Sequence, residues 1–177
     1  MNDLAFDAMI YAREIHKDQV RKYTGNPYTD HLAEVAGIVA TVATFHTHNE
    51  VTIATAWLHD SIEDCGVDRY YLGSRFCDLV STGVQLLSDV ETGNRAQRKE
   101  ASRKRLEAAP GWVQSIKVAD LISNTSSIVQ HDPAFAKIYL EEKRLMLAVL
   151  KKADRRLLEV AHGQVNKAIS ELSLSFD

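Results

Sequence analysis

The sequence predicts an all-α fold, and three observations support this expectation. The 177-residue chain contains only three prolines and eight glycines, so few positions interrupt a regular helix. Apolar residues recur at intervals of three and four along most of the chain, which is the spacing of one face of an α-helix. A candidate strand at residues 83–87 is short and has no neighbouring strand pattern to pair with. We therefore expect one compact helical bundle, with residues 1–177 as a single domain.

The composition is that of an ordinary globular protein, with 45% hydrophobic residues, 25% charged residues and a formal net charge of −3. A general nucleic-acid-binding surface would usually make the chain basic, so this class is not expected. Cys65 and Cys77 lack CxxC spacing and are too few for a disulfide framework, which favours a reducing cytoplasm. No run approaches the ~20 apolar residues of a membrane helix, and no signal peptide is recognisable. The sequence predicts a soluble cytoplasmic protein of open oligomeric state.

The first half of the chain is expected to hold three helices. A polar loop with Gly25 and Pro27 separates the first two, because both residue types favour turns. Thr29 or Asp30 can cap the second helix. The expected ranges are 4–15, about 30–42 and about 50–66.

The second half of the chain shows weaker helical patterns and then three stronger ones. Pro110 could be the first residue of a helix, where its missing N–H costs nothing. Asp132 followed by Pro133 is typical of an N-cap and the first helical residue after it. The expected ranges are about 69–87, 95–108, from 110, 133–150 and about 155–172.

The most informative segment is W-L-H-D-S-I-E-D at residues 57–64. His59, Asp60, Glu63 and Asp64 fall within six residues, directly after a nearly uncharged run. Carboxylates at the end of a buried helix are costly unless a cation balances them. On a continuous helix the first and third of these residues, and likewise the second and fourth, would be i,i+4 neighbours. This pattern predicts a divalent-cation site.

Further metal-ligand types lie elsewhere in the chain. His31 begins the second expected helix, and Asp120 and Asn124 are i,i+4 on a later one. His31 and Asp120, together with His59 and Asp60, would form a mixed nitrogen and oxygen site, which suits Mn²⁺, Fe²⁺ or Zn²⁺ better than Ca²⁺. Such a site leaves coordination positions open for water and a phosphate oxygen, as hydrolytic sites require.

The order H…HD…D resembles the HD-domain metal-dependent phosphohydrolases. Three finer patterns resemble the hydrolase domain of the RelA/SpoT proteins: H-x-x-Q-x-R-K…G-x-P-Y-x-x-H at residues 16–31, H-D-x-x-E-D at 59–64 and K-x-A-D-x-x-x-N at 117–124. Those enzymes remove pyrophosphate from the 3′ position of the alarmone ppGpp. The resemblance covers about residues 6–139. A chain ending at 177 leaves no room for separate synthetase and regulatory domains, so a stand-alone small alarmone hydrolase is expected.

The resemblance also implies roles for individual residues. It implies one Mn²⁺ ion held by His31, His59, Asp60 and Asp120. Glu63 and Asp64 would orient and deprotonate the attacking water. The residues implied to bind substrate are Arg21 and Lys22 for phosphates, Asn124 for the nucleotide sugar, Arg95 for a further phosphate, and Tyr139 near the nucleotide.

The chain departs from the family pattern at two places. Leu32 replaces the proline that usually follows the first metal histidine. Asn124 is followed by Thr125, Ser126 and Ser127, where the family has an apolar residue and then arginine. The choice between guanosine and adenosine alarmones is therefore left open, as is action on NADPH or pyrophosphorylated RNA.

Other interpretations remain at this point. The chain could be an HD phosphohydrolase of another nucleotide, such as a nucleotide monophosphatase or an NADPH phosphatase. It could be an antitoxin that neutralises an alarmone-synthesising toxin, or a purely structural helical module. The basic residues between 95 and 105 are most simply a solvated helix face. His46, His48, His131 and His162 belong to no motif and are expected on the surface or satisfied locally.

Overall fold

The computed structural model describes residues 3–43 and 49–174 of the chain. Within this part there are ten helices and no named strand, which confirms the all-α prediction. An isolated antiparallel bridge between Val20 and Pro27 closes the polar loop. The helices are α1 Leu4–Ile15, α2 Tyr28–Ala43, α3 Asn49–Leu58, α4 Ser61–Cys65, α5 Arg69–Arg75, α6 Asp78–Leu87, α7 Arg95–Ala108, α8 Gly111–His131, α9 Pro133–Leu147 and α10 Arg155–Leu174.

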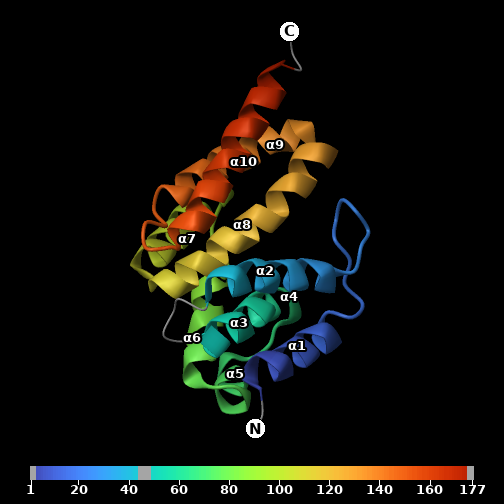
Figure 1. Ribbon diagram of the computed structural model, residues 1–177, viewed down its shortest axis with the longest axis vertical. Coiled ribbons are helices and arrows are strands. Elements are labelled where there is room, and N and C mark those ends of the chain that lie inside the picture. Colours follow the sequence, from blue (N-terminus) through green and yellow to red (C-terminus); the bar gives the residue numbers. More distant parts are fainter. Residues whose placement is uncertain (1–2, 44–48, 175–177) are drawn as a thin grey trace.

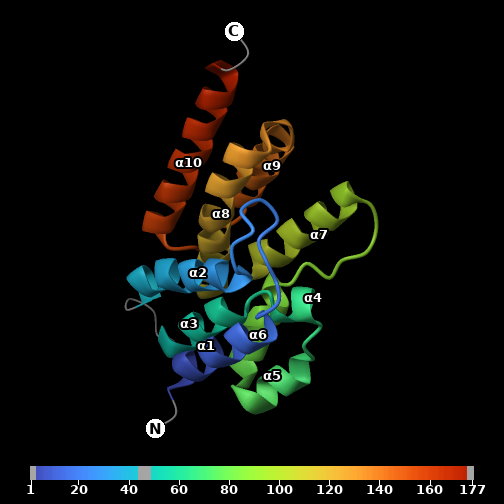
Figure 2. The same ribbon diagram turned by 90° about the vertical axis from the view of Figure 1, so that its right-hand side faces the viewer.

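The helices pack around two hydrophobic clusters. The cluster at one end joins α1, α3, α5 and α6 and includes Ala12, Leu58 and Val84. The other joins α8 to α2, α7, α9 and α10 and includes Val39 and Ile116. Figures 1 and 2 both show α2 lying between the two ends of the molecule. Residues of α2 and α3 therefore face residues of α8 near the middle of the fold.

Helix α8 is the central element, because it packs against α2, α3, α6, α7, α9 and α10. Its first half is buried on nearly all sides, as Val113, Ile116, Val118 and Ala119 are all fully buried. Asp120, on the same stretch, is only 7% exposed. A carboxylate in such a place requires a charged or hydrogen-bonding partner.

The acidic motif does not form one continuous helix, and this part of the prediction was wrong. Helix α3 ends at Leu58, a turn holds His59 and Asp60, and α4 begins at Ser61. On a continuous helix, adjacent side chains diverge by about 100°. The turn instead lets His59 and Asp60 approach each other, with the histidine Nε2 2.8 Å from the aspartate Oδ2.

Helix α4 is short and has a defined end. Gly66 follows it with a φ of 64°, in the left-handed region that favours glycine, and its N–H is bonded to the carbonyl of Ile62. This cap limits α4 to the one turn that carries Glu63 and Asp64.

Four other boundaries differ from the sequence prediction. The segment 69–87 is two helices, and the candidate strand 83–87 belongs to α6, whose Val80, Val84 and Leu87 share one buried face. A Cβ added at Gly83 would lie 2.5 Å from the ring of Trp112. The absence of a side chain at Gly83 therefore allows α6 and α8 to pack closely. Pro110 is the N-cap residue of α8 rather than its first helical residue. Helix α2 begins about two residues earlier than expected, and α9 ends three residues earlier.

The predicted cap of α9 is confirmed. The Asp132 carboxylate accepts a hydrogen bond of 3.1 Å from the N–H of Phe135, and Pro133 is the first helical residue. In the part of the chain that the structure describes, no helix is both long enough and apolar enough to cross a membrane.

Candidate metal centre

Two histidines present the same ring nitrogen to one point between α2, α3 and α8. The Nδ1 of His59 is 2.8 Å from the carbonyl oxygen of Ala56, which can only accept a hydrogen bond, so this nitrogen carries the proton. The Nδ1 of His31 is 2.8 Å from Ser123 Oγ, and that hydroxyl donates to Glu34 Oε2 at 2.6 Å. The serine therefore accepts from His31, and the Nε2 atoms of both rings face the cluster.

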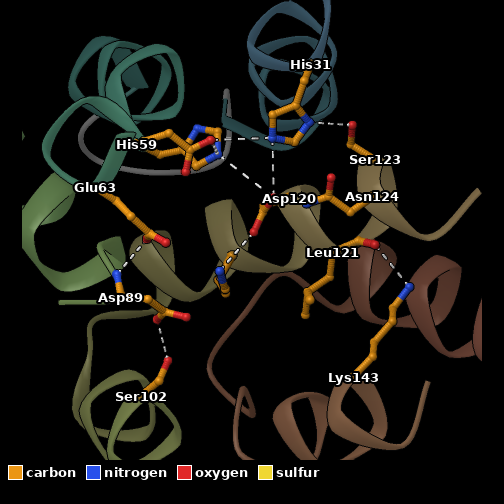
Figure 3. Close-up of polar contacts among 12 residues, drawn as sticks. His31, His59, Glu63, Asp89, Ser102, Asp120, Leu121, Ser123, Asn124 and Lys143 are labelled. Carbon is orange, nitrogen blue, oxygen red and sulfur yellow. Dashed lines mark hydrogen bonds and ion pairs between the residues drawn. The ribbon is translucent and has the colours of Figure 1, made fainter. Parts of the chain in front are cut away.

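Two carboxylates complete the cluster. Asp120 Oδ1 lies 3.4 Å from Nε2 of His31 and 3.9 Å from Nε2 of His59 (Figure 3). Asp60 Oδ2 lies 2.8 Å from Nε2 of His59 and 3.6 Å from Nε2 of His31. The structure thus brings together the four residues that the sequence predicted as metal ligands.

Neighbouring side chains donate hydrogen bonds to the carboxylates of both aspartates. Lys117 Nζ donates to Asp120 Oδ2 at 2.9 Å, and Asn124 Nδ2 donates to Asp120 Oδ1 at 2.6 Å. The Tyr28 hydroxyl donates to Asp60 Oδ2 at 2.7 Å. These contacts fix where the carboxylates point before any ligand binds.

The donor set fits a divalent transition-metal ion. One oxygen of Asp120 and one nitrogen each from His31 and His59 lie within 4.8 Å of one another, and all three residues are buried. The Nε2 of His59 is buried and, among the described residues, lacks a hydrogen-bond partner of acceptable geometry. A buried nitrogen of this kind is costly unless something binds it. Imidazole and carboxylate together suit Mn²⁺, Fe²⁺ or Zn²⁺.

The ionisation of the cluster also indicates a need for positive charge. Burial alone would lower the pKa of His31, but Asp120 and Asp60 outweigh it and raise that pKa to about 9. At His59, too, burial would lower the pKa, but Asp60 outweighs this effect and raises that pKa. Burial would raise the pKa of Asp120, yet Lys117 and the two histidines hold it well below its usual range. Protons on the histidines balance the carboxylates here, and a metal ion would take their place.

Glu63 and Asp64 lie beside the cluster on α4, each with one carboxylate oxygen engaged. Glu63 Oε2 accepts a hydrogen bond of 2.8 Å from the N–H of Asp89 (Figure 3). Burial raises the pKa of Glu63, partly opposed by that bond. Asp64 Oδ2 accepts from Gln19 Nε2 at 2.7 Å, and His16 Nδ1 lies 2.6 Å from Gln19 Oε1. Since a neutral or charged imidazole can donate there, His16 orients the amide of Gln19.

Arg21 reaches the site from the polar loop, whereas Lys22 does not. The Arg21 guanidinium donates to Asn124 Oδ1 at 2.9 Å and lies 3.6 Å from Glu34 Oε2. It therefore joins the loop to α8 at the edge of the cluster. Lys22 is exposed, with its ammonium 5.0 Å from the ring centre of Tyr23.

Arg95 and Tyr139 lie further from the cluster. Arg95 makes two hydrogen bonds, of 2.6 and 2.8 Å, to the carboxylate of Glu142. Together with Glu63 it lines a cavity of about 200 Å³ between α4 and α7. The Tyr139 hydroxyl lies 3.4 Å from Thr125 Oγ1, and burial raises its pKa.

Several residues around the site carried no role in the sequence analysis. Ser123 lies three residues after Asp120 on α8, so helical spacing could have indicated it. Tyr28 and Gln19 stand inside the first motif. No sequence pattern around Asp89 indicates its contact with Glu63, because the two residues are 26 positions apart and come together only in the folded protein. His46 and His48 lie outside the described residues, as do the side chains of Ser126 and Ser127.

Comparison with known proteins places this site in context. The family model described as HD domain matches residues 8–143. A GTP pyrophosphokinase rsh of Brucella melitensis is 31% identical over 147 residues, covering 80% of this chain and 18% of that protein. A guanosine-3′,5′-bis(diphosphate) 3′-pyrophosphohydrolase of Vibrio cholerae is 33% identical over 110 residues, covering 62% of this chain and 15% of that protein. The chain thus spans less than a fifth of the length of these curated relatives.

A solved structure shares the fold. It is that of a metazoan ortholog of SpoT, described as hydrolysing ppGpp and playing a role in starvation responses. The TM-score is 0.83 at 20% sequence identity, and the match covers 94% of this chain and 96% of that one. A structure from Listeria monocytogenes also matches, with a TM-score of 0.64 at 19% identity over 81% of this chain and 96% of that one.

Proposed function

Because the chain belongs to the HD-domain family, we propose that it is a manganese-dependent hydrolase that removes 3′-pyrophosphate from ppGpp-type alarmones. The products would be GDP or GTP and pyrophosphate. The observation that carries the proposal is the convergence of two histidine Nε2 atoms and Asp120 beside the acidic pair on α4. The names of the Vibrio and metazoan relatives support this choice of substrate.

His31, His59, Asp60 and Asp120 would hold the ion. When bound, a divalent metal supplies Lewis acidity and brings the pKa of a water towards neutral. The hydrogen bonds that His31 donates to Ser123 and His59 donates to the Ala56 carbonyl already fix both rings in the ligating tautomer. Binding would displace the protons that the histidines carry in the metal-free protein.

Glu63 and Asp64 would orient the attacking water and accept its proton. Each carboxylate has one oxygen held, by the Asp89 N–H and by Gln19 respectively, so the other oxygen can accept a proton at a defined position. Water oxygen would bond to the phosphorus attached to the 3′ oxygen. The bond between that phosphorus and the 3′ oxygen would break, and the sugar oxygen would leave with a proton.

Substrate charge would be met from the polar loop. Arg21 is held by neutral hydrogen bonds of 2.9 Å to Asn124 and 3.5 Å to Ser123 and by a longer contact to Glu34, so a phosphate could replace these partners. Lys22 would add a second cation, and Asn124 would contact the sugar. We propose Arg95 and Tyr139 as further substrate residues, and Arg95 would have to leave Glu142 to bind a phosphate.

The experiment is hydrolysis of ppGpp with added Mn²⁺, resolving nucleotide and phosphate products. We expect GDP and pyrophosphate from the wild type, and no turnover from Asp60→Ala or from the double variant Glu63→Gln/Asp64→Asn. Release of orthophosphate alone would assign the site to another phosphohydrolase reaction. A parallel assay with the adenosine analogue and with NADPH would define the substrate class.

Two further proposals concern the whole protein. We propose that residues 1–177 act as one domain, since α8 packs against helices from both halves of the chain. A cytoplasmic location remains a prediction from the cysteine pattern, and Cys65 and Cys77 are free thiols in the structure. Oligomeric state is a matter for measurement in solution.

A further inference from the structure

Glu63 is held by a backbone group from a distant segment. Its Oε2 accepts a 2.8 Å hydrogen bond from the N–H of Asp89, which lies between α6 and α7, 26 residues further along the chain. A backbone donor cannot be moved by a side-chain rotation. The position of Glu63 therefore depends on what fixes the backbone at Asp89.

The Asp89 carboxylate is fixed by three donors on one face of α7. Lys99 Nζ donates at 3.0 Å, Ser102 Oγ at 2.8 Å (Figure 3) and Arg105 at 2.9 Å. Arg105 also donates to the carbonyl of Leu86 at the end of α6, at 3.1 Å. The segment is thereby tied to both helices that flank it.

The negative charge of the Asp89 carboxylate is also stabilised. Burial alone would raise its pKa, but Lys117 and Lys99 outweigh it and lower that pKa to about 2. Asp89 is therefore a carboxylate throughout the neutral range, and the three donors on α7 always have an acceptor.

The sequence suggested that the basic residues of α7 form a solvated face, and this is true of only some of them. Lys104 is exposed to solvent, with its Nζ 3.4 Å from Glu100 Oε1, and Glu100 is itself half exposed. Lys99 and Arg105 instead turn towards Asp89. Helix α7 thus has an inner face whose donors converge on Asp89, and Arg105 on this face also pairs with Glu91.

We propose that Asp89 is a positioning residue for Glu63. Its carboxylate, bound by Lys99, Ser102 and Arg105, holds the backbone so that its own N–H orients the Glu63 carboxylate beside the metal cluster. The inference rests on the role given to Glu63 in the proposed function. Asp89 would then affect the proton-transfer step without touching metal or substrate.

The test is a double-mutant cycle with Asp89→Ala and Glu63→Gln. Asp89→Ala is expected to lower kcat for ppGpp by about 10- to 100-fold, part of the roughly 10²–10⁴-fold that a positioned acid–base group contributes. The KM and the bound Mn²⁺ should not change. In the Glu63→Gln background the same substitution should cause no further loss of kcat. Lys104→Ala, on the exposed and opposite face of α7, should leave kcat unchanged.

Other variants and outcomes complete the design. Asp89→Asn keeps one acceptor oxygen and should retain more activity than Asp89→Ala. If Asp89→Ala does not fold, Ser102→Ala removes a single neutral donor, and its smaller loss of kcat should likewise disappear in the Glu63→Gln background. An additive loss in either cycle, or a change in KM with kcat intact, would overturn the proposal.

A crystal structure separates this inference from the proposed function. If wild-type protein releases no pyrophosphate from ppGpp, the proposed function fails, and the positions of Glu63 in wild-type and Asp89→Ala crystals decide the positioning role. Displacement of the Glu63 carboxylate from the amide of residue 89 supports it. An unchanged Glu63 in the variant overturns it.

Discussion

At the residue scale, the orientation of the two histidines depends on what their Nδ1 atoms contact. His59 uses a backbone carbonyl of its own turn, whereas His31 depends on a side chain of α8, Ser123, and through it on Glu34. A side-chain partner can be removed by mutation without changing a ligand. Metal affinity should therefore respond to residues that never touch the ion.

We predict that Ser123→Ala weakens Mn²⁺ binding by about 10- to 100-fold, because His31 loses the acceptor that fixes its tautomer. Titration calorimetry or competition with a chelating dye would measure this change. Ser115→Ala is the matched control, since Ser115 is also buried on α8 but bonds to the Gly111 carbonyl and the Asp154 N–H. Equal affinity in the wild type and Ser123→Ala would contradict the prediction.

The pKa of His31 predicts how the metal-free protein responds to pH. That pKa is raised from 6.5 to about 9 by Asp120 and Asp60, against burial, so protonation stabilises the native state. The stabilisation is complete below about pH 6.5 and is lost as the pH rises through about 9. Converted at 1.36 kcal/mol per unit, it amounts to about 3 kcal/mol at most.

Urea unfolding of chelator-treated protein between pH 6.5 and 9 would measure this dependence. We expect the free energy of unfolding to fall with rising pH, and to fall less in His31→Gln. With Mn²⁺ present, the stabilisation by metal should grow with pH, because the ion needs unprotonated Nε2 atoms. If the free energy of unfolding of metal-free His31→Gln depended on pH as strongly as that of the metal-free wild type, the assignment to His31 would be wrong.

At the scale of single elements, the break between α3 and α4 determines the geometry of the acidic motif. Gly66 ends α4 in the left-handed region, with no atom within 4 Å of an added Cβ. Substitution at Gly66 therefore changes mainly the conformational free energy of the backbone, because an added side chain would contact no other atom. The effect can therefore be isolated.

We predict that Gly66→Ala lowers the free energy of unfolding by about 1–2 kcal/mol, the cost of a left-handed conformation for an L-residue. Gly163→Ala is the control, because Gly163 lies within α10 and also has no atom within 4 Å of an added Cβ. That variant should gain up to about 1 kcal/mol from helix propensity. Chemical denaturation of both variants checks the opposite signs, and the same sign for both would be evidence against this account of α4.

At the scale of the whole molecule, the candidate centre lies where the chain's two hydrophobic clusters meet. The residues that would bind the ion come from α2, from the turn after α3 and from α8, and both α2 and α3 contribute residues to each cluster. Each cluster is built from buried apolar residues that do not include the proposed ligands. Removing the metal should therefore weaken the fold without abolishing its helices.

We predict that Mn²⁺ at 100 times its dissociation constant adds about 2.7 kcal/mol to the free energy of unfolding. Chelation should reverse this gain while far-UV circular dichroism stays the same. His59→Asn serves as the control, because a variant lacking one ligand should gain much less from added Mn²⁺. A loss of helix on chelation would instead indicate that the metal is needed for folding.

Much of the fold and most of the centre could be predicted from sequence, and the limits have a physical basis. The 3.6-residue period identifies α1 and α7 almost to the residue, and the Asp132–Pro133 cap identifies the start of α9. The turn at His59 and Asp60 was not predicted because its residues are compatible with a helix, whereas the contacts of Asp60 with His31 and Tyr28 form only in the folded protein. Short apolar runs, such as residues 83–87, do not by themselves distinguish strand from helix.

Residue type and spacing are enough to predict that the chain is helical, that it carries the residues of an HD-type motif, and that an acidic pair follows them by one turn. These properties are local, encoded in residue type and spacing. Only the tertiary structure decided that Ser123 and Glu34 orient His31, that Gln19 holds Asp64, and that the N–H of Asp89 holds Glu63. Such contacts join residues far apart in the chain, and packing of the two hydrophobic clusters, which no local pattern encodes, brings them together.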